Sequence, residues 1–71
     1  MAHVRGTTLA LAAAPLPGRP LDPDVTVETA SEALRVLSDA ILATDSPALV
    51  TRYRVAQDRW LDALSQLTTA H

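Results

Sequence analysis

The sequence predicts an all-α protein in which two antiparallel helices form a hairpin, preceded by a proline-rich extended tail. Apolar residues recur at helical spacing over residues 23–43 and again over residues 47–69, and a capping and proline signal separates the two spans. Neither span shows the alternation that is typical of a strand. We therefore divide the chain into a flexible or partner-docked tail, residues 1–22, and a helical hairpin domain, residues 23–71.

The tail contains most of the prolines. Residues 15–23 read PLPGRPLDP and hold four of the five prolines in the chain. Proline fixes φ and removes a backbone donor, so this stretch is predicted to be extended or irregular. Arg5 and the LALAAA run at residues 9–14 would also suit a cleaved signal, but the apolar run is short and has one positive charge before it. The PxxP match at residues 17–20 is most simply interpreted as part of a linker.

The first helix of the hairpin has two possible starts. Asp22 suits an N-cap followed by Pro23 in the first turn, whereas Thr29 suits an N-cap with Glu32 closing a capping box. The apolar pattern begins before Thr29, which favours the early start and predicts a helix over residues 23–43. The pattern consists of Val27, Ala30, Leu34, Leu37 and Ile41.

Residues 44–46 end the first helix and begin the second. Asp45 or Ser46 is suited to cap the second helix, and Pro47 fits its first turn without losing a needed hydrogen bond. The second helix is predicted over residues 47–69. Because a short connection makes neighbouring helices antiparallel, the two helices are expected to pack as a hairpin.

Both helices carry apolar arcs of roughly 160–180°, wider than the narrow stripe that one helix–helix seam requires. A lone hairpin would leave the surplus in water, and contiguous exposed apolar surface usually marks an interface. The simplest closure is a homodimer that forms a C₂-symmetric four-helix bundle, and a larger protein assembly is the other candidate. The predicted interface consists of Leu34, Leu37, Ile41, Val50, Tyr53, Gln57, Trp60, Leu61, Leu64 and Leu67.

Two details of the arcs bear on the packing. The small residues Ala30, Ala33 and Ala40 of the first helix are expected to lie opposite the bulky Trp60 and Tyr53 of the second. Gln57 lies inside the second apolar arc, where it either fixes register and oligomeric state when buried or reaches water from the edge.

Arginines flank the apolar arc of the second helix. Arg52 and Arg59 are seven residues apart on one side, which suits interface-rim residues that pair with carboxylates of a partner. The alternative is a small nucleic-acid-associated regulator that uses these arginines and the neighbouring aromatics, assisted by Arg5 and Arg19. The formal net charge of −2 argues against general nucleic-acid binding.

Nothing in the sequence assembles a catalytic, cofactor or metal site. Cysteine is absent, His3 and His71 are far apart along the chain, and no nucleophile lies in a known motif, so no small-molecule substrate is evident. Glu28, Glu32 and Asp39 share a helix side with Arg35 between them, a spacing typical of solvated ion pairs.

Composition adds the remaining expectations. No apolar run approaches the roughly 18 residues of a membrane span, and a cysteine-free chain suits the cytoplasm. All six basic residues are arginine, and lysine, asparagine and phenylalanine are absent, which suggests a high-GC bacterial or phage gene. The sequence thus predicts a non-enzymatic protein–protein interaction or assembly module.

Overall fold

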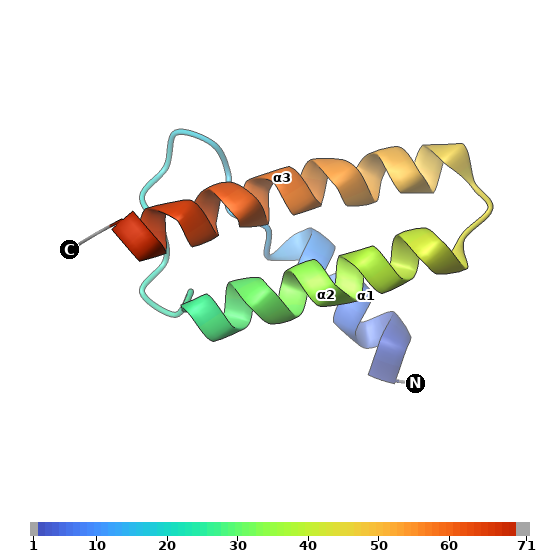
Figure 1. Ribbon diagram of the computed structural model, residues 1–71, viewed down its shortest axis with the longest axis horizontal. Coiled ribbons are helices and arrows are strands. Elements are labelled where there is room, and N and C mark those ends of the chain that lie inside the picture. The colour runs from blue at the N-terminus through green and yellow to red at the C-terminus, as the bar shows by residue number, and fades with distance from the viewer. Residues whose placement is uncertain (1, 70–71) are drawn as a thin grey trace.

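The computed structural model describes the backbone of residues 2–69 and the side chains of residues 6–69. Within residues 2–69 it contains three α-helices and no strand: α1 (Ala2–Ala12), α2 (Val27–Ala43) and α3 (Pro47–Thr69). The predicted all-α class is confirmed, but the predicted number of helices is wrong. Figure 1 shows α2 and α3 side by side and running in opposite directions, with α1 behind them.

Helix α1 occupies part of the segment that the sequence predicts to be an extended tail. Its run of alanine and leucine permits a helix, but an eleven-residue helix is marginal in water unless it packs against something. The packing comes from α2 and α3, which are distant in the sequence. The tertiary contact therefore decides the conformation of this segment.

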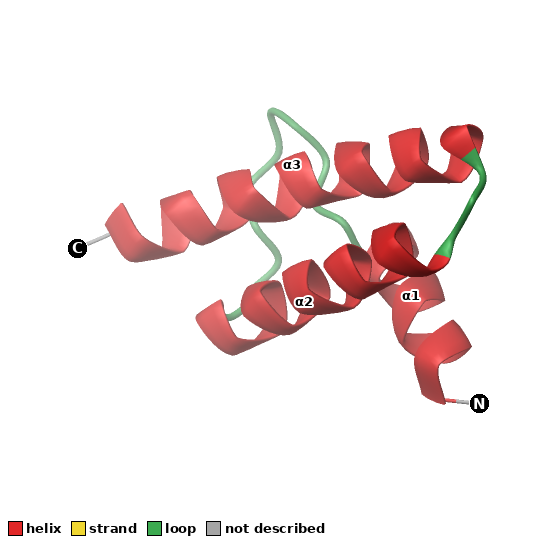
Figure 2. Ribbon diagram, turned by 45° about the vertical axis from the view of Figure 1, so that its right-hand side comes forward, coloured by secondary structure: helices red, strands yellow, loops and turns green. Residues whose placement is uncertain are grey.

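Residues 13–26 link α1 to α2 and contain no helix, as predicted for the proline-rich stretch before residue 23 but not for residues 23–26. Gly18 has φ of +79°, a left-handed conformation that glycine adopts without steric cost. Leu21 and Val25 pack against the core, so the second half of the linker is held against the helices. Figures 1 and 2 show this linker on the same side of α2 and α3 as α1.

Helix α2 begins four residues later than the sequence predicts. Its N-cap is Thr26, with extended backbone angles and a side-chain oxygen that accepts from the Thr29 amide at 3.1 Å. Asp22 instead accepts from the Asp24 amide at 2.9 Å and stabilises a turn in the linker. Neither predicted cap, Asp22 or Thr29, begins the helix: Asp22 caps a single turn that does not continue into α2, and Thr29 lies inside the first turn, where its amide donates to Thr26.

Helix α3 covers the residues that the sequence predicts, and α2 ends at the predicted Ala43. Ser46 acts as the cap of α3, since its hydroxyl accepts from the Leu49 amide at 3.3 Å. Pro47 then occupies the first turn, where its missing amide donor costs nothing.

The core lies where the three helices meet, and alanine dominates it. Trp60 and Leu37 are its only large, fully buried side chains among the described residues, at 1% and 0% exposure. Small side chains let the helix axes approach closely, which leaves one tryptophan and one leucine to fill the centre. The other buried residues of the described chain are Ala10, Ala14, Ala30, Ala33, Ala56 and Ala63.

Candidate functional site

Trp60 joins α3 to the C-terminal end of α1. Its indole Nε1 donates a hydrogen bond of 2.8 Å to the backbone oxygen of Ala10. The last four carbonyl groups of a helix have no partner within the helix, and a buried one must find a partner elsewhere. The Leu9 carbonyl accepts from the Ala13 amide, and the Ala10 carbonyl accepts from Trp60. Trp60 therefore serves both as the centre of the core and as a cap for α1.

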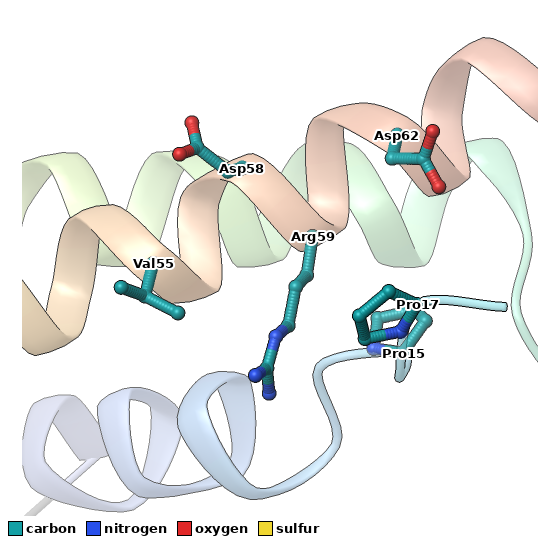
Figure 3. Close-up of a pocket in the computed structure, with 6 residues that line it drawn as sticks. All are labelled: Pro15, Pro17, Val55, Asp58, Arg59 and Asp62. Atoms are coloured by element: carbon teal, nitrogen blue, oxygen red, sulfur yellow. The ribbon is translucent and has the colours of Figure 1, made fainter.

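Arg59, the residue before Trp60, also points at this end of α1. Figure 3 shows its side chain extending from α3 toward the end of α1 and the linker residues Pro15 and Pro17. The carboxylate of neighbouring Asp58 points away from it. The C-terminal end of a helix carries partial negative charge, so the guanidinium is favourably placed there.

Small residues on one side of α1 make its contact with the other helices. Ala10 and Ala14 are buried, and Gly6 lies one helical turn earlier on the same side. A β-carbon on Gly6 would lie 3.7 Å from Val36 Cγ1 on α2. We call Gly6 and Ala10 the small-residue side of α1, and Ala14 is buried just past the end of this helix. The small-residue side covers the side of the α2 and α3 pair on which Val36 and Arg59 lie.

The opposite side of the α2 and α3 pair carries a contact between the two helices themselves. Gln57 Nε2 donates to Ser38 Oγ at 3.0 Å. Ser38 follows Val36 by two residues, and Gln57 precedes Arg59 by two, which places each about 200° around its helix from the residue that faces α1 or the linker. Gln57 is half-buried. Its exposure is thus intermediate between the buried and the water-exposed alternatives that the sequence allows, and its side-chain amide donates within the chain.

The residues of α2 on the same side as Ser38, together with the residues of α3 on the same side as Leu61, form a surface that we call the uncovered face. Figure 1 views the molecule from this side, with α1 and the linker behind. Leu42 and Leu61 are its most exposed large apolar residues, at 86% and 52%. On α2 the face comprises Val27, Ser31, Leu34, Ser38, Ile41 and Leu42, and on α3 it comprises Pro47, Val50, Arg54, Gln57, Leu61, Leu64, Ser65 and Thr68.

Charge is nearly absent from the uncovered face. Arg54 is the one ionisable residue within about 40° of Ser38 on α2 or of Leu61 on α3, although a fifth of the chain is charged. Arg35 and Asp58 follow at about 60° on the outer edges. The core of a protein interface is characteristically depleted of charged residues, whereas a solvated helix face is not. The uncovered face therefore has the composition of an interface core.

An ion-pair cluster lies on the outer side of α2, away from this face. Arg35 pairs with Glu32 and also lies 3.9 Å from Asp39. The hydrogen bond and the charge of Glu32 raise the pKa of Arg35. All three side chains are well exposed, so the contribution of this cluster to stability is small.

The residues predicted to form the interface fall into three groups. Leu37 and Trp60 are buried within the chain itself. Tyr53 and Leu67 are half-buried, between the side of the α2 and α3 pair that faces α1 and the uncovered face. The uncovered face holds the remainder, which are Leu34, Ile41, Val50, Gln57, Leu61 and Leu64.

The two predicted rim arginines lie elsewhere. Arg59 is half-buried beside the linker, and Arg52 is exposed on the same side of α3. Arg54, which the sequence analysis did not select, lies on the uncovered face instead. The spacing of the arginines could not reveal this, because it does not show which side of α3 is covered by residues 2–20.

The described residues contain two open grooves. One, of about 300 Å³, is lined by Pro15, Pro17, Val55, Asp58, Arg59 and Asp62. The other, of about 880 Å³, separates α1 from α2, with Leu11, Val36 and Tyr53 among its lining residues. No group of three metal-ligating side chains occurs in residues 6–69, and His71 and the side chains of His3 and Arg5 lie outside the described part. No described helix is long and apolar enough to cross a membrane.

Comparison with family models, with curated protein sequences and with solved structures finds no match to this chain.

Proposed function

We propose that the protein is a non-enzymatic assembly module that self-associates through the uncovered face. Two copies would meet face to face, with α2 and α3 of each forming a four-helix core and the α1 helices outside. The observation that carries the proposal is a continuous two-helix surface with one charge and exposed leucines at positions 42 and 61. Eight of the fourteen residues of this face are apolar, and exposed apolar surface that is depleted of charge usually marks an interface.

A second copy suits this face for an electrostatic reason. In a two-fold symmetric dimer residue i of one copy contacts residue j of the other, so a face that carries a strong net charge of one sign would repel its copy. The uncovered face limits that penalty because it carries the single charge of Arg54 near its centre, about 20° around α3 from Leu61 on the side away from α2. At this position its long stem can cover apolar surface while the guanidinium remains in water.

The dimensions of the molecule also suit a dimer. The two longest extents are 40 and 23 Å, and α2 and α3 lie side by side across this plane. A rectangle of that size also encloses α1 and the linker, so its area, on the order of 900 Å², is an upper limit for the face that still allows the roughly 800 Å² each partner contributes to a stable interface. Full burial of an exposed leucine side chain contributes about 1.5–3 kcal/mol, so Leu42 and Leu61 supply a substantial driving force in each copy.

Sedimentation velocity over a range of micromolar concentrations tests the proposal. Wild-type protein should shift toward a dimer with increasing concentration, and Leu61→Arg should remain monomeric with unchanged helix content. Val55→Arg is the matched control, because Val55 is 46% exposed on α3 but lies on the other side of the helix. A wild-type protein that stays monomeric throughout, or equal effects from both variants, would overturn the proposal.

The nucleic-acid alternative has weaker support. Arg59 points toward the protein's own linker, and Arg52 and Arg54 lie on different sides of α3, so the three arginines do not form one basic surface. The alternative predicts binding that weakens steeply with salt and is lost in an Arg52→Ala, Arg59→Ala double variant.

A further inference from the structure

The attachment of α1 to the rest of the chain has a second possible geometry. Helix α1 has eleven residues, below the roughly 12–15 at which an isolated helix becomes marginally stable, and it includes Gly6. It is therefore helical because it is docked. Docking depends on the small-residue side, on Leu11 packed against the core and on a hydrogen bond from Trp60, beside an open groove of about 880 Å³ that both α1 and α2 line. Contacts of this kind characterise segments that open locally.

The linker is long enough to carry α1 to a neighbouring molecule. Leu21 is packed against the core, so the eight residues 13–20 form the part that extends freely once α1 and Ala14 leave. At about 3.1 Å per residue in the extended conformation that proline favours, they span about 25 Å. This reach matches the 23 Å intermediate dimension of the molecule. A copy lying alongside is therefore within range while Leu21 stays in place.

We propose that α1 also docks in trans, on the α2 and α3 pair of a second copy. In the exchanged state, Trp60 of one chain donates to the Ala10 carbonyl of the other, and Gly6 of one chain lies against Val36 of the other. The Trp60–Ala10 and Gly6–Val36 pairs are the same in the two states, so exchange keeps these contacts, loses the burial of Ala14 in the linker, and is favoured by rising concentration. The docking site for α1 and the uncovered face lie on opposite sides of one helix pair, so a chain that uses both becomes part of an assembly larger than a dimer.

This exchange does not depend on self-association through the uncovered face, and cysteine chemistry separates the two. The chain contains no cysteine, so introduced thiols are unique. A Gly6→Cys chain is mixed with a Val36→Cys chain that carries a size tag, both in the Leu61→Arg background. The mixture is then treated with a short thiol cross-linker. The conditions are those under which the reagent joins the two cysteines of a single chain that carries both Gly6→Cys and Val36→Cys. Exchange should yield a cross-linked heterodimer whose amount rises with total concentration.

The matched control replaces Gly6→Cys with Leu9→Cys, because Leu9 is on the same helix but 60% exposed. We expect at least several times more heterodimer from the Gly6 and Val36 pair than from the Leu9 and Val36 pair. Equal yields from the two pairs would overturn the proposal. So would a heterodimer that appears with wild-type Leu61 and vanishes with Leu61→Arg, because the bridge would then report face-to-face association alone.

Discussion

The indole nitrogen of Trp60 and the backbone oxygen of Ala10, fifty residues apart in the chain, lie 2.8 Å apart in a buried hydrogen bond. This bond connects the middle of the last helix to the end of the first. The carbonyl belongs to the last turn of α1, where the helix itself supplies no donor. The bond thus explains why a segment with little helical stability of its own is ordered against the other two helices.

Trp60→Phe should destabilise the protein by about 1–3 kcal/mol, because it leaves the Ala10 carbonyl buried without a donor, and lost packing adds to this cost. The free energy of unfolding from urea titration measures the effect. Tyr53→Phe is the control, since the structure records no partner for the Tyr53 hydroxyl among the described residues. A loss in Trp60→Phe no larger than in Tyr53→Phe would show that the bond contributes nothing.

Ala10→Glu should release α1, because it places a bulky charge at a position that is 5% exposed. Trp60 is the only tryptophan, so its emission should shift to the red as its cover departs. Far-ultraviolet circular dichroism should show loss of about one short helix. Ala12→Glu makes the same substitution at an exposed position of α1 and should leave the emission unchanged. If Ala10→Glu also leaves it unchanged, α1 does not shield Trp60.

Arg59→Gln should weaken the docking of α1 by about 0.3–1 kcal/mol, since it removes a cation from the negative end of a helix. High salt should reduce the difference from wild type. Hydrogen exchange of the α1 amides provides the measurement. Arg52→Gln is the control and should have no effect. Equal protection of α1 in wild type and Arg59→Gln at low salt would contradict this role for Arg59.

Thr26→Ala should destabilise α2 by about 1 kcal/mol, because its hydroxyl is the N-cap acceptor for the Thr29 amide. Asp22→Ala should cost less, since Asp22 closes a turn in the exposed linker. Thermal or urea unfolding of both variants distinguishes the two positions. A larger loss of stability for Asp22→Ala than for Thr26→Ala would indicate that the helix begins where the apolar pattern predicts.

Leu37→Ala should cost about 2–5 kcal/mol, because Leu37 is fully buried beside small side chains that cannot close the cavity. Leu42→Ala, on the same helix, should leave the stability of the monomer nearly unchanged. Under the proposed function it should weaken self-association instead, because Leu42 lies on the uncovered face. Chemical unfolding and sedimentation measured on both variants separate the two roles.

Much of the fold could be predicted because it depends on local signals. Ser46 and Pro47 mark the start of α3 through capping chemistry that involves a few neighbouring residues. The buried positions Leu37 and Trp60 lie within the predicted apolar arcs, since helical periodicity places them there. The start of α2 was misplaced because Asp22 and Thr26 both suit capping, and the turn in the linker decides between them.

The candidate site depended on information that local signals do not carry. Leu34 and Leu61 were identified as apolar positions in wide arcs, but each arc contained residues that turned out to lie on different sides of the helix pair. Which side remains open is decided by where α1 docks. Arg59 and Arg54 have the same residue type and nearly the same sequence context, yet one faces the linker and the other lies on the uncovered face.

The sequence by itself determined the all-α class, the bounds of α3, the end of α2 and the existence of more apolar surface than one helix seam can bury. These follow from backbone capping and from helical periodicity, which act over a few residues. Only the tertiary structure decided that residues 2–12 are helical and that they cover the Trp60 side. That outcome depends on small side chains of α1 meeting Val36 and Trp60, and a contact across fifty residues leaves no periodic trace in the sequence.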